Sequence, residues 1–352
     1  MRASFVPIVA LAGLASAQQL DIAAINVAPL PATTAAPVGA TAQSSLAYNS
    51  AAAATSATDD VQPTSAPSSA NKVKRGDCSP QPAGAGPKVS PDTPEAFSNY
   101  PYFHALANSV GPPFPYIEKF RDLNGSTQQN SYLTYYVLNS YDVIKCAQYC
   151  NNVDLCTAFN LYVERDPSLD PGAACPNPPS TTNYKCALWG SSISRDSATN
   201  TGQYREQFHV VIAASNGYDK TPFVTPTAPA NFSLSASLGN KAITLAGQFS
   251  LGSEFFAGPY DPSLCGFYAT AQTSANRADA QAKGLKTYQA ANSFNSYFVY
   301  KGGFAWGTYC TLFNKNIDSS YAGNINASSN GVTYGVGSSF QWSLTQQDAG
   351  TL

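Results

Sequence analysis

The chain has 352 residues, of which 11% are charged, and its formal net charge is −2. This length allows two domains with their own cores, and the weak charge excludes the basic surface that a nucleic-acid partner needs. Aromatic residues make up 12% of the chain, with 21 tyrosines. That composition favours half-buried antiparallel sheet first and a sugar-facing surface second.

The N-terminus has the three parts of a secretory signal peptide. Met1 and Arg2 supply positive charge, residues 5–15 form an apolar run, and small residues lead to a cleavage site after Ala17. The run is too short to span a bilayer, and no later stretch reaches 18 apolar residues. We expect residues 1–17 to be removed and the protein to be secreted, without a membrane span. Three Asn-x-Ser sequons fit that route, at Asn124, Asn231 and Asn326.

Residues 18–75 have the composition of a pro-segment. They are rich in Ala, Thr, Ser and Pro and lack the large apolar side chains that offset chain entropy, so we expect disorder. The segment ends at Lys74 and Arg75, a dibasic pair that resembles a kexin-type processing site. Because the composition changes sharply beyond this pair, we expect cleavage after Arg75.

Residues 76–115 form an N-terminal arm that should contain two short helical turns. Thr93 is suited to cap the first turn, with Pro94 at its first helical position. Pro101 interrupts the pattern, and the turns should reach about Asn108.

Residues 116–220, here called module 1, read as one helix laid on an antiparallel sheet. Residues 132–138 are strand-like, and Asp142 is suited to cap a helix of about ten residues. Cys146 and Cys150 lie four apart on that helix and so share a face. Residues 157–164 alternate as a half-buried strand, and further strands are expected at 185–189 and 207–212. The predicted fold class is therefore α+β.

After a Pro-rich linker at 221–230, the pattern recurs in degenerate form over residues 231–346, here called module 2, with 347–352 as a tail. Four blocks return in the same order, including a capped helix at about 262–283. The matched pairs are Tyr141 to Cys146 with Tyr260 to Cys265, 158–162 with 293–297, 185–189 with 309–313, and Ser215 with Ser339.

Eight cysteines in an oxidising compartment predict four disulfides rather than a metal site. Two cysteines of module 1 are retained in module 2, which predicts one pair in each module. Two others are both replaced by alanine, which predicts that they pair with each other. The predicted bonds are Cys146–Cys186, Cys265–Cys310 and Cys150–Cys156. Cys150 and Cys156 align with Ala269 and Ala291 in module 2. Elimination then leaves Cys78–Cys175.

A helix with Cys-x3-Cys, a strand with Cys-x-x-Phe-Asn and a strand with Cys-x-Leu resemble the PAN/apple module over about 116–213 and, in reduced form, 250–342. The wider run resembles a group of secreted proteins of filamentous ascomycetes. The residues that carry this likeness are 90–93, 140–142, 164–167, 175–179, 185–190, 208–212 and 215–218. The resemblance implies a fungal extracellular or cell-wall protein whose modules bind proteins or carbohydrates and are not catalytic.

The sequence contains no catalytic motif. The two histidines, His104 and His209, are too few for a His-rich metal site, and His209 alternates within a strand as a structural imidazole would. There is no His-Glu-x-x-His, no Gly-x-Ser-x-Gly and no phosphate-binding Gly-rich loop. We expect no metal, no cofactor and no enzymatic activity.

Five residues are candidates for ligand binding. Glu164, Arg165 and Arg205 belong to the one dense group of charges, for which surface salt bridges at a sheet edge are the main interpretation and a polar groove the alternative. Core packing is favoured for Trp189 and Trp306. Of the two, Trp306 is the better candidate for a side chain on which a ligand stacks, because residues 302–307 look like an exposed turn between strands.

These features predict a non-catalytic binding protein of the cell wall or extracellular space that recognises a polysaccharide or a glycoprotein. The alternative is a structural or effector-like protein that binds a protein partner through the edge of module 1. The third and weakest hypothesis is a hydrolase of wall polymers that would depend on Glu164. The sequence does not define an oligomeric state.

Overall fold

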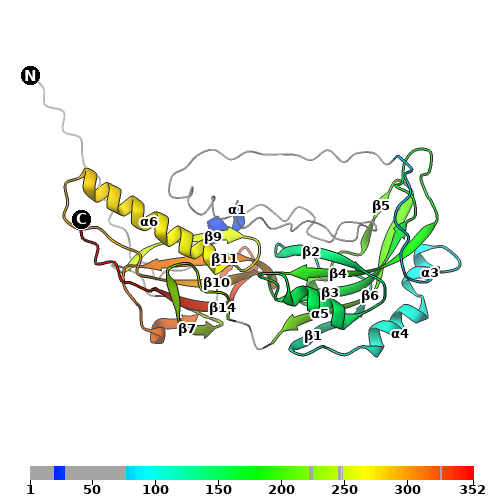
Figure 1. Ribbon diagram of the computed structural model, residues 1–352, viewed down its shortest axis with the longest axis horizontal. Coiled ribbons are helices and arrows are strands. Elements are labelled where there is room, and N and C mark those ends of the chain that lie inside the picture. The colour runs from blue at the N-terminus through cyan, green and yellow to red at the C-terminus, as the bar shows by residue number, and fades with distance from the viewer. Residues whose placement is uncertain (1–19, 28–76, 222–224, 245–246, 248, 326) are drawn as a thin grey trace, which may run out of the picture.

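Two antiparallel sheets form the protein, one in each half of the chain, and they lie side by side along the long axis of the molecule (Figure 1). The structure is a computed structural model that describes residues 20–27, 77–221, 225–244, 247, 249–325 and 327–352. The predicted signal peptide with Ala17, the dibasic pair Lys74 and Arg75, and Asn326 lie outside the described residues.

The first sheet has the strand order β1-β6-β3-β4-β2, with β5 paired to β6. β3 lies at its centre between β6 and β4, and nearly every side chain along β3 and β6 is buried because both faces of the sheet are covered. The strands are β1 (Tyr116–Leu123), β2 (Tyr132–Leu138), β3 (Ala158–Pro167), β4 (Ser180–Trp189), β5 (Gly202–Arg205) and β6 (Phe208–Lys220).

Three helices pack on one face of this sheet: α3 (Pro94–Ser98), α4 (Pro101–Ser109) and α5 (Val143–Asn151). The predicted starts of two of them are confirmed. The Thr93 hydroxyl accepts from the Ala96 amide at the start of α3, and the Asp142 carboxylate accepts from the Lys145 amide at the start of α5. A 3-10 turn, η1 (Arg195–Ser197), follows β4.

The second sheet repeats this plan. Its path β7-β14-β10-β11-β9 corresponds strand for strand to β1-β6-β3-β4-β2, and α6 (Pro262–Ala282) takes the place of α5. The strands are β7 (Phe232–Gly239), β9 (Ser250–Ala257), β10 (Ser293–Lys301), β11 (Phe304–Phe313), β13 (Ala327–Ser329) and β14 (Val332–Leu344). The short strands β8 (Lys241–Ile243) and β12 (Ala322–Asn324) pair beside it, and η2 (Ser319–Tyr321) precedes β12.

The bulges of the two sheets also correspond. In β6, Ala214 has a φ of 54°, and in β14, Ser338 has a φ of 53°. In both sheets the register shifts where the central strand meets this residue. Since such backbone is uncommon for residues other than glycine, its presence at equal places supports duplication of one ancestral unit.

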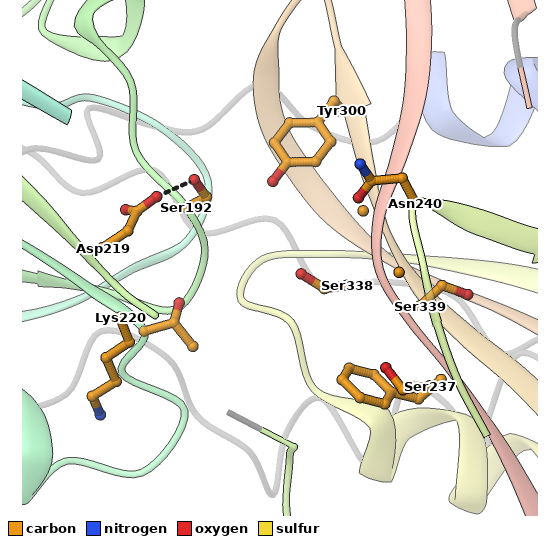
Figure 2. Close-up of a pocket in the computed structure, with 12 residues that line it drawn as sticks. Ser192, Asp219, Lys220, Ser237, Asn240, Tyr300, Ser338 and Ser339 are labelled. Atoms are coloured by element: carbon orange, nitrogen blue, oxygen red, sulfur yellow. Dashed lines mark hydrogen bonds between the residues drawn. The ribbon is translucent and has the colours of Figure 1, made fainter. Parts of the chain in front are cut away.

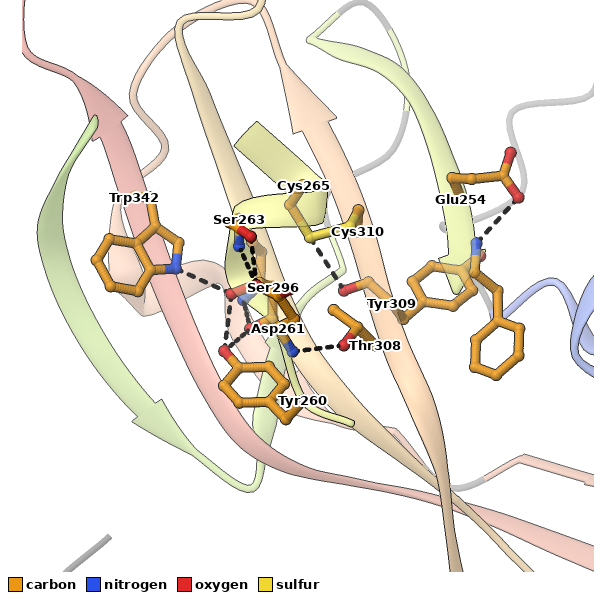
Figure 3. Close-up of a disulfide and its surroundings, with 12 residues drawn as sticks. Glu254, Tyr260, Asp261, Ser263, Cys265, Ser296, Thr308, Tyr309, Cys310 and Trp342 are labelled. Atoms are coloured by element: carbon orange, nitrogen blue, oxygen red, sulfur yellow. Dashed lines mark hydrogen bonds between the residues drawn. A yellow bond between two sulfur atoms is a disulfide. The ribbon is translucent and has the colours of Figure 1, made fainter. Parts of the chain in front are cut away.

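All four predicted disulfides are present: Cys78–Cys175, Cys146–Cys186, Cys150–Cys156 and Cys265–Cys310. In each module one bond joins the helix to a central strand, so the α+β, disulfide-pinned fold class is as predicted. Figure 3 shows this bond in module 2, where Cys265 near the start of α6 meets Cys310 on β11. Beside it, the Trp342 indole donates to the Ser296 hydroxyl at 2.9 Å.

The expected disorder of residues 18–75 is wrong for residues 20–27. This segment contains α1 (Ile22–Val27), which lies beside β9 (Figure 1). It packs on the face of the second sheet that α6 leaves open. Leu20 and Ile25 are its only buried side chains, and they insert among aromatic side chains of the sheet. The composition of the segment predicts disorder because composition describes the segment alone. It gives no sign of a surface elsewhere in the chain on which the segment can pack.

None of the helices in the described ranges is both long enough and apolar enough to cross a membrane.

Candidate functional site

The two sheets meet at a close junction. The Tyr260 amide donates to the Gly190 carbonyl at 3.0 Å, and the Asn130 side chain donates to the Trp306 carbonyl at 3.3 Å. A side chain at Gly190 would place its Cβ 2.5 Å from Cβ of Pro259, so glycine is needed for this approach. These contacts hold the ends of both sheets at a fixed separation.

A cavity of about 220 Å³ lies beside this junction and takes its walls from both modules (Figure 2). Most of the residues that line it are polar. Module 1 contributes Thr157, Ser192 and Asp219, and module 2 contributes Asn240, Tyr300 and Ser338. The strained backbone of the β14 bulge thus presents the Ser338 side chain at the cavity.

Asp219, near the end of β6, supplies the carboxylate of the cavity. Its oxygens accept from the Ser192 hydroxyl and from the Ile193 amide at 3.0 Å, and the Lys119 ammonium lies 3.5 Å away. Burial raises the pKa of Asp219 above its ordinary value of 3.8, although these three partners favour the charged form.

Two hydroxyls complete the polar wall. The Tyr300 phenol points from β10 towards Ser192 (Figure 2), and burial raises the pKa of Tyr300 to about 12, so it is a neutral donor at physiological pH. The Thr157 hydroxyl is buried and makes no hydrogen bond with any described residue. A buried hydroxyl without a partner is costly, and because this oxygen is enclosed it is not itself open to a ligand in the cavity.

Lys220 lines the cavity with its aliphatic stem only. Its ammonium group turns towards the small disulfide loop of module 1, where it donates to the carbonyls of Cys156 at 2.8 Å and Cys150 at 3.4 Å. Burial lowers the pKa of Lys220. Among the described residues that line the cavity, Asp219 is the single carboxylate.

Two of the charges singled out in the sequence, Glu164 and Arg165, are buried and are not surface salt bridges at a sheet edge. Glu164 is 1% exposed on the central strand β3 and is paired with the Lys185 ammonium, which also lies 3.7 Å from Asp166. Burial and the nearby Asp166 raise the pKa of Glu164 well above 4.5. Burial opposes the charge on Lys185, but Asp166 and Glu164 outweigh it and raise the pKa of that group.

The two candidate arginines have partners within module 1. The buried Arg165 guanidinium bonds Asp92 at 2.7 Å and lies 4.2 Å from the centre of the Phe208 ring. Arg205 lies on the edge strand β5 and forms a partly exposed ion pair with Asp170, as the main interpretation predicted. The Asp92 contact ties the N-terminal arm to the sheet, so these charges serve the fold rather than an open groove.

Trp189 is completely buried in the core of module 1, as the favoured interpretation predicted. Trp306 is not in an exposed turn. Gly302 and Gly303 form the turn, while Trp306 lies within β11, is 9% exposed and donates from its indole to the Ile25 carbonyl at 3.1 Å. β11 begins at Phe304, directly after the two glycines, so the turn is shorter than the glycine pattern suggested.

Both histidines have structural partners. His104 lies between the Asp122 carboxylate and the Ser98 carbonyl, and the His209 ring stacks on Tyr204 with centroids 4.2 Å apart. In the part of the chain that the structure describes, no three His, Cys, Asp or Glu side chains are grouped as a metal site. Of the sequons, Asn124 and Asn231 are exposed.

The sequence analysis did not identify any of the cavity residues as a candidate for ligand binding. They include serines, a threonine, an aspartate, an asparagine and a tyrosine in strands or turns, and they come together only because the two modules dock. The Pro-rich linker indicated two modules but gave no signal for how their edges would meet.

No protein-family model, no curated protein and no solved structure matches this chain.

Proposed function

We propose that the protein is a secreted, non-catalytic binding protein of the cell wall or extracellular space, and that the cavity between its modules takes one sugar unit of a polysaccharide or glycoprotein. The observation that carries the proposal is the set of hydroxyl, amide and carboxylate groups from both modules around one small cavity. A sugar ring offers hydroxyl groups that both donate and accept, which suits this lining.

The volume of the cavity supports a small ligand. At about 220 Å³ it falls below the roughly 300–1,000 Å³ of pockets for drug-sized molecules. The PAN/apple resemblance, which rests on the cysteine spacing, enters the proposal because modules of that kind bind carbohydrates or proteins.

A hydrolase is less well supported. Most glycoside hydrolases need two carboxyl groups on either side of the scissile bond, whereas Asp219 is the one carboxylate among the described lining residues. Glu164, the residue on which that hypothesis depended, is enclosed by Lys185 and the sheet. Protein binding through the module 1 edge is also less favoured, because Arg165 is buried.

The test is retention of the secreted chain on chitin, on β-glucan and on a glycan array. Asn240 is exposed at the cavity, so Asn240→Trp should block the cavity without disturbing the fold. We expect at least a tenfold loss of binding, whereas Asn324→Trp, at an exposed position on β12, should bind as the unmodified chain does. Equal retention of both variants, or no retention of the unmodified chain, would contradict the proposal.

A further inference from the structure

The second sheet has a face that α6 does not cover, and aromatic side chains dominate it. Tyr297 and Tyr309 stack there with centroids 5.2 Å apart, and the Lys301 ammonium lies 4.5 Å from the Trp306 ring centre. This cluster shares no residue with the cavity between the modules. Its members are Ala242, Phe255, Tyr297, Val299, Trp306, Tyr309, Tyr334 and Val336, hereafter the aromatic face.

Residues 20–27 occupy this face as a bound peptide would. Leu20 is 5% exposed and Ile25 is fully buried, while Val27 at the end of the same helix is 81% exposed. The segment therefore has one apolar side that fits the sheet and one side in solvent.

Three hydrogen bonds from the face fix the position of the segment. The Trp306 indole donates to the Ile25 carbonyl at 3.1 Å, and the Tyr309 hydroxyl accepts from the Asp21 amide at 2.9 Å. The Tyr334 hydroxyl donates to the Asn26 side chain at 2.9 Å. Two of these bonds satisfy main-chain groups of the segment, which is how peptide-binding surfaces recognise a ligand.

We propose that the aromatic face is a peptide-binding site whose ligand is the chain's own residues 20–27, held there by the covalent connection and released by cleavage after Arg75. The segment precedes the dibasic pair in the sequence, and the sheet that holds it follows that pair. A cut at the pair therefore turns an intramolecular contact into a bimolecular one.

The effect of the cut follows from the strength of the contact. Two buried aliphatic side chains and three hydrogen bonds give a short peptide little surplus over the entropy lost on binding, so we expect a dissociation constant on the order of 0.1–1 mM. The covalent connection through residues 28–76 provides an effective concentration on the order of millimolar. The connected segment is thus bound in about half to nine tenths of the molecules, whereas the freed segment dissociates at micromolar protein concentration and uncovers Trp306.

Tryptophan fluorescence can follow this site, because Trp189 and Trp342 are completely buried and Trp306 alone lies on the aromatic face. In the uncut chain, Ile25→Asp should undock the segment and increase acrylamide quenching of one tryptophan in three. Val27→Asp is the matched control and should leave quenching unchanged. A synthetic peptide of residues 18–30, titrated into the low millimolar range, should reverse the quenching in the Ile25→Asp chain and have a much smaller effect in the unmodified chain, whose site is mostly occupied.

The unmodified chain cut after Arg75 gives the same measurement without a substitution in the segment. On gel filtration at micromolar concentration, the fragment 18–75 should separate from the rest and quenching should rise; a Lys74→Ala, Arg75→Ala chain should show neither change. Unchanged quenching in both the cut chain and Ile25→Asp would overturn the peptide site. Co-elution of the fragment after cutting would overturn its release.

Discussion

Asn160 on β3 and Asn295 on β10 make the same three hydrogen bonds in two different sheets. Each side-chain amide donates at 2.9 Å to a serine hydroxyl on the neighbouring strand, Ser215 or Ser339. Each also donates at 2.9 Å to the next carbonyl along that strand. The side-chain oxygen of Asn160 accepts from the Thr127 amide, and the side-chain oxygen of Asn295 accepts from the Ile243 amide. Asparagine is needed because it alone supplies two donors and an acceptor at this size.

Replacing either asparagine with leucine should therefore be strongly destabilising. Both residues are completely buried, and each substitution leaves three polar groups without a partner. We expect a loss of roughly 2–4 kcal/mol in the free energy of unfolding for Asn160→Leu and a similar loss for Asn295→Leu. Guanidinium denaturation measures this, and Asn324→Leu on the exposed β12 should change stability by less than about 0.5 kcal/mol. Unequal losses would show that the two sites are not equivalent.

The sequence predicted the module plan because the relevant signals are local. The caps at Thr93 and Asp142 and the cysteine pattern act within a few residues or within one duplicated unit. The buried placement of Glu164 was missed, because a strand that is covered on both faces does not show which of its charges are enclosed. The docking of residues 20–27 was missed for a related reason, since the partner surface lies more than 200 residues away.

The disulfides should differ in importance according to the loops that they close. Cys146–Cys186 spans 40 residues and Cys150–Cys156 spans 6. By loop entropy, their removal as Cys→Ser pairs should lower stability by about 4 and about 2 kcal/mol respectively. Thermal unfolding under non-reducing conditions measures both. A larger loss from the short loop would contradict the entropic account.

Module 2 offers a site at which the missing bond could be restored. Ala269 and Ala291, at the places of Cys150 and Cys156, are both buried in one apolar cluster. We expect the pair Ala269→Cys and Ala291→Cys to oxidise and to raise stability by about 1–3 kcal/mol. The gain should disappear in reducing agent, and either single variant should lack it. A folded double variant with two free thiols would show that the helix of module 2 lies differently from that of module 1.

Glu164 should make the protein more stable in acid than at neutral pH. Its pKa is raised by burial and by Asp166, so the folded chain holds this proton more tightly than the unfolded chain does. As pH rises from the ordinary value of 4.5 through the raised pKa, the unfolded state gives up the proton first, and the free energy of unfolding falls. Burial of Asp219 acts in the same direction above pH 3.8.

The substitution Glu164→Gln isolates this contribution, because glutamine keeps the size and cannot ionise. Melting temperatures across pH 4.5–8 should fall less steeply for Glu164→Gln than for the unmodified chain. Glu95→Gln, at an exposed carboxyl group on α3, is the matched control and should follow the unmodified chain. Parallel curves for all three proteins would mean that Glu164 does not titrate in this window.

Gly190 should control how the two modules meet, and through this the cavity between them. A methyl group there would lie 2.5 Å from the Pro259 side chain, well inside contact distance, so Gly190→Ala must push the modules apart or distort the junction. We expect a loss of about 1–3 kcal/mol and weaker glycan retention, because the walls of the cavity come from both sides of this junction. Gly111→Ala is the control, since no atom lies within 4 Å of the added methyl group. If Gly190→Ala kept full stability and full retention, the junction would not determine the geometry of the cavity.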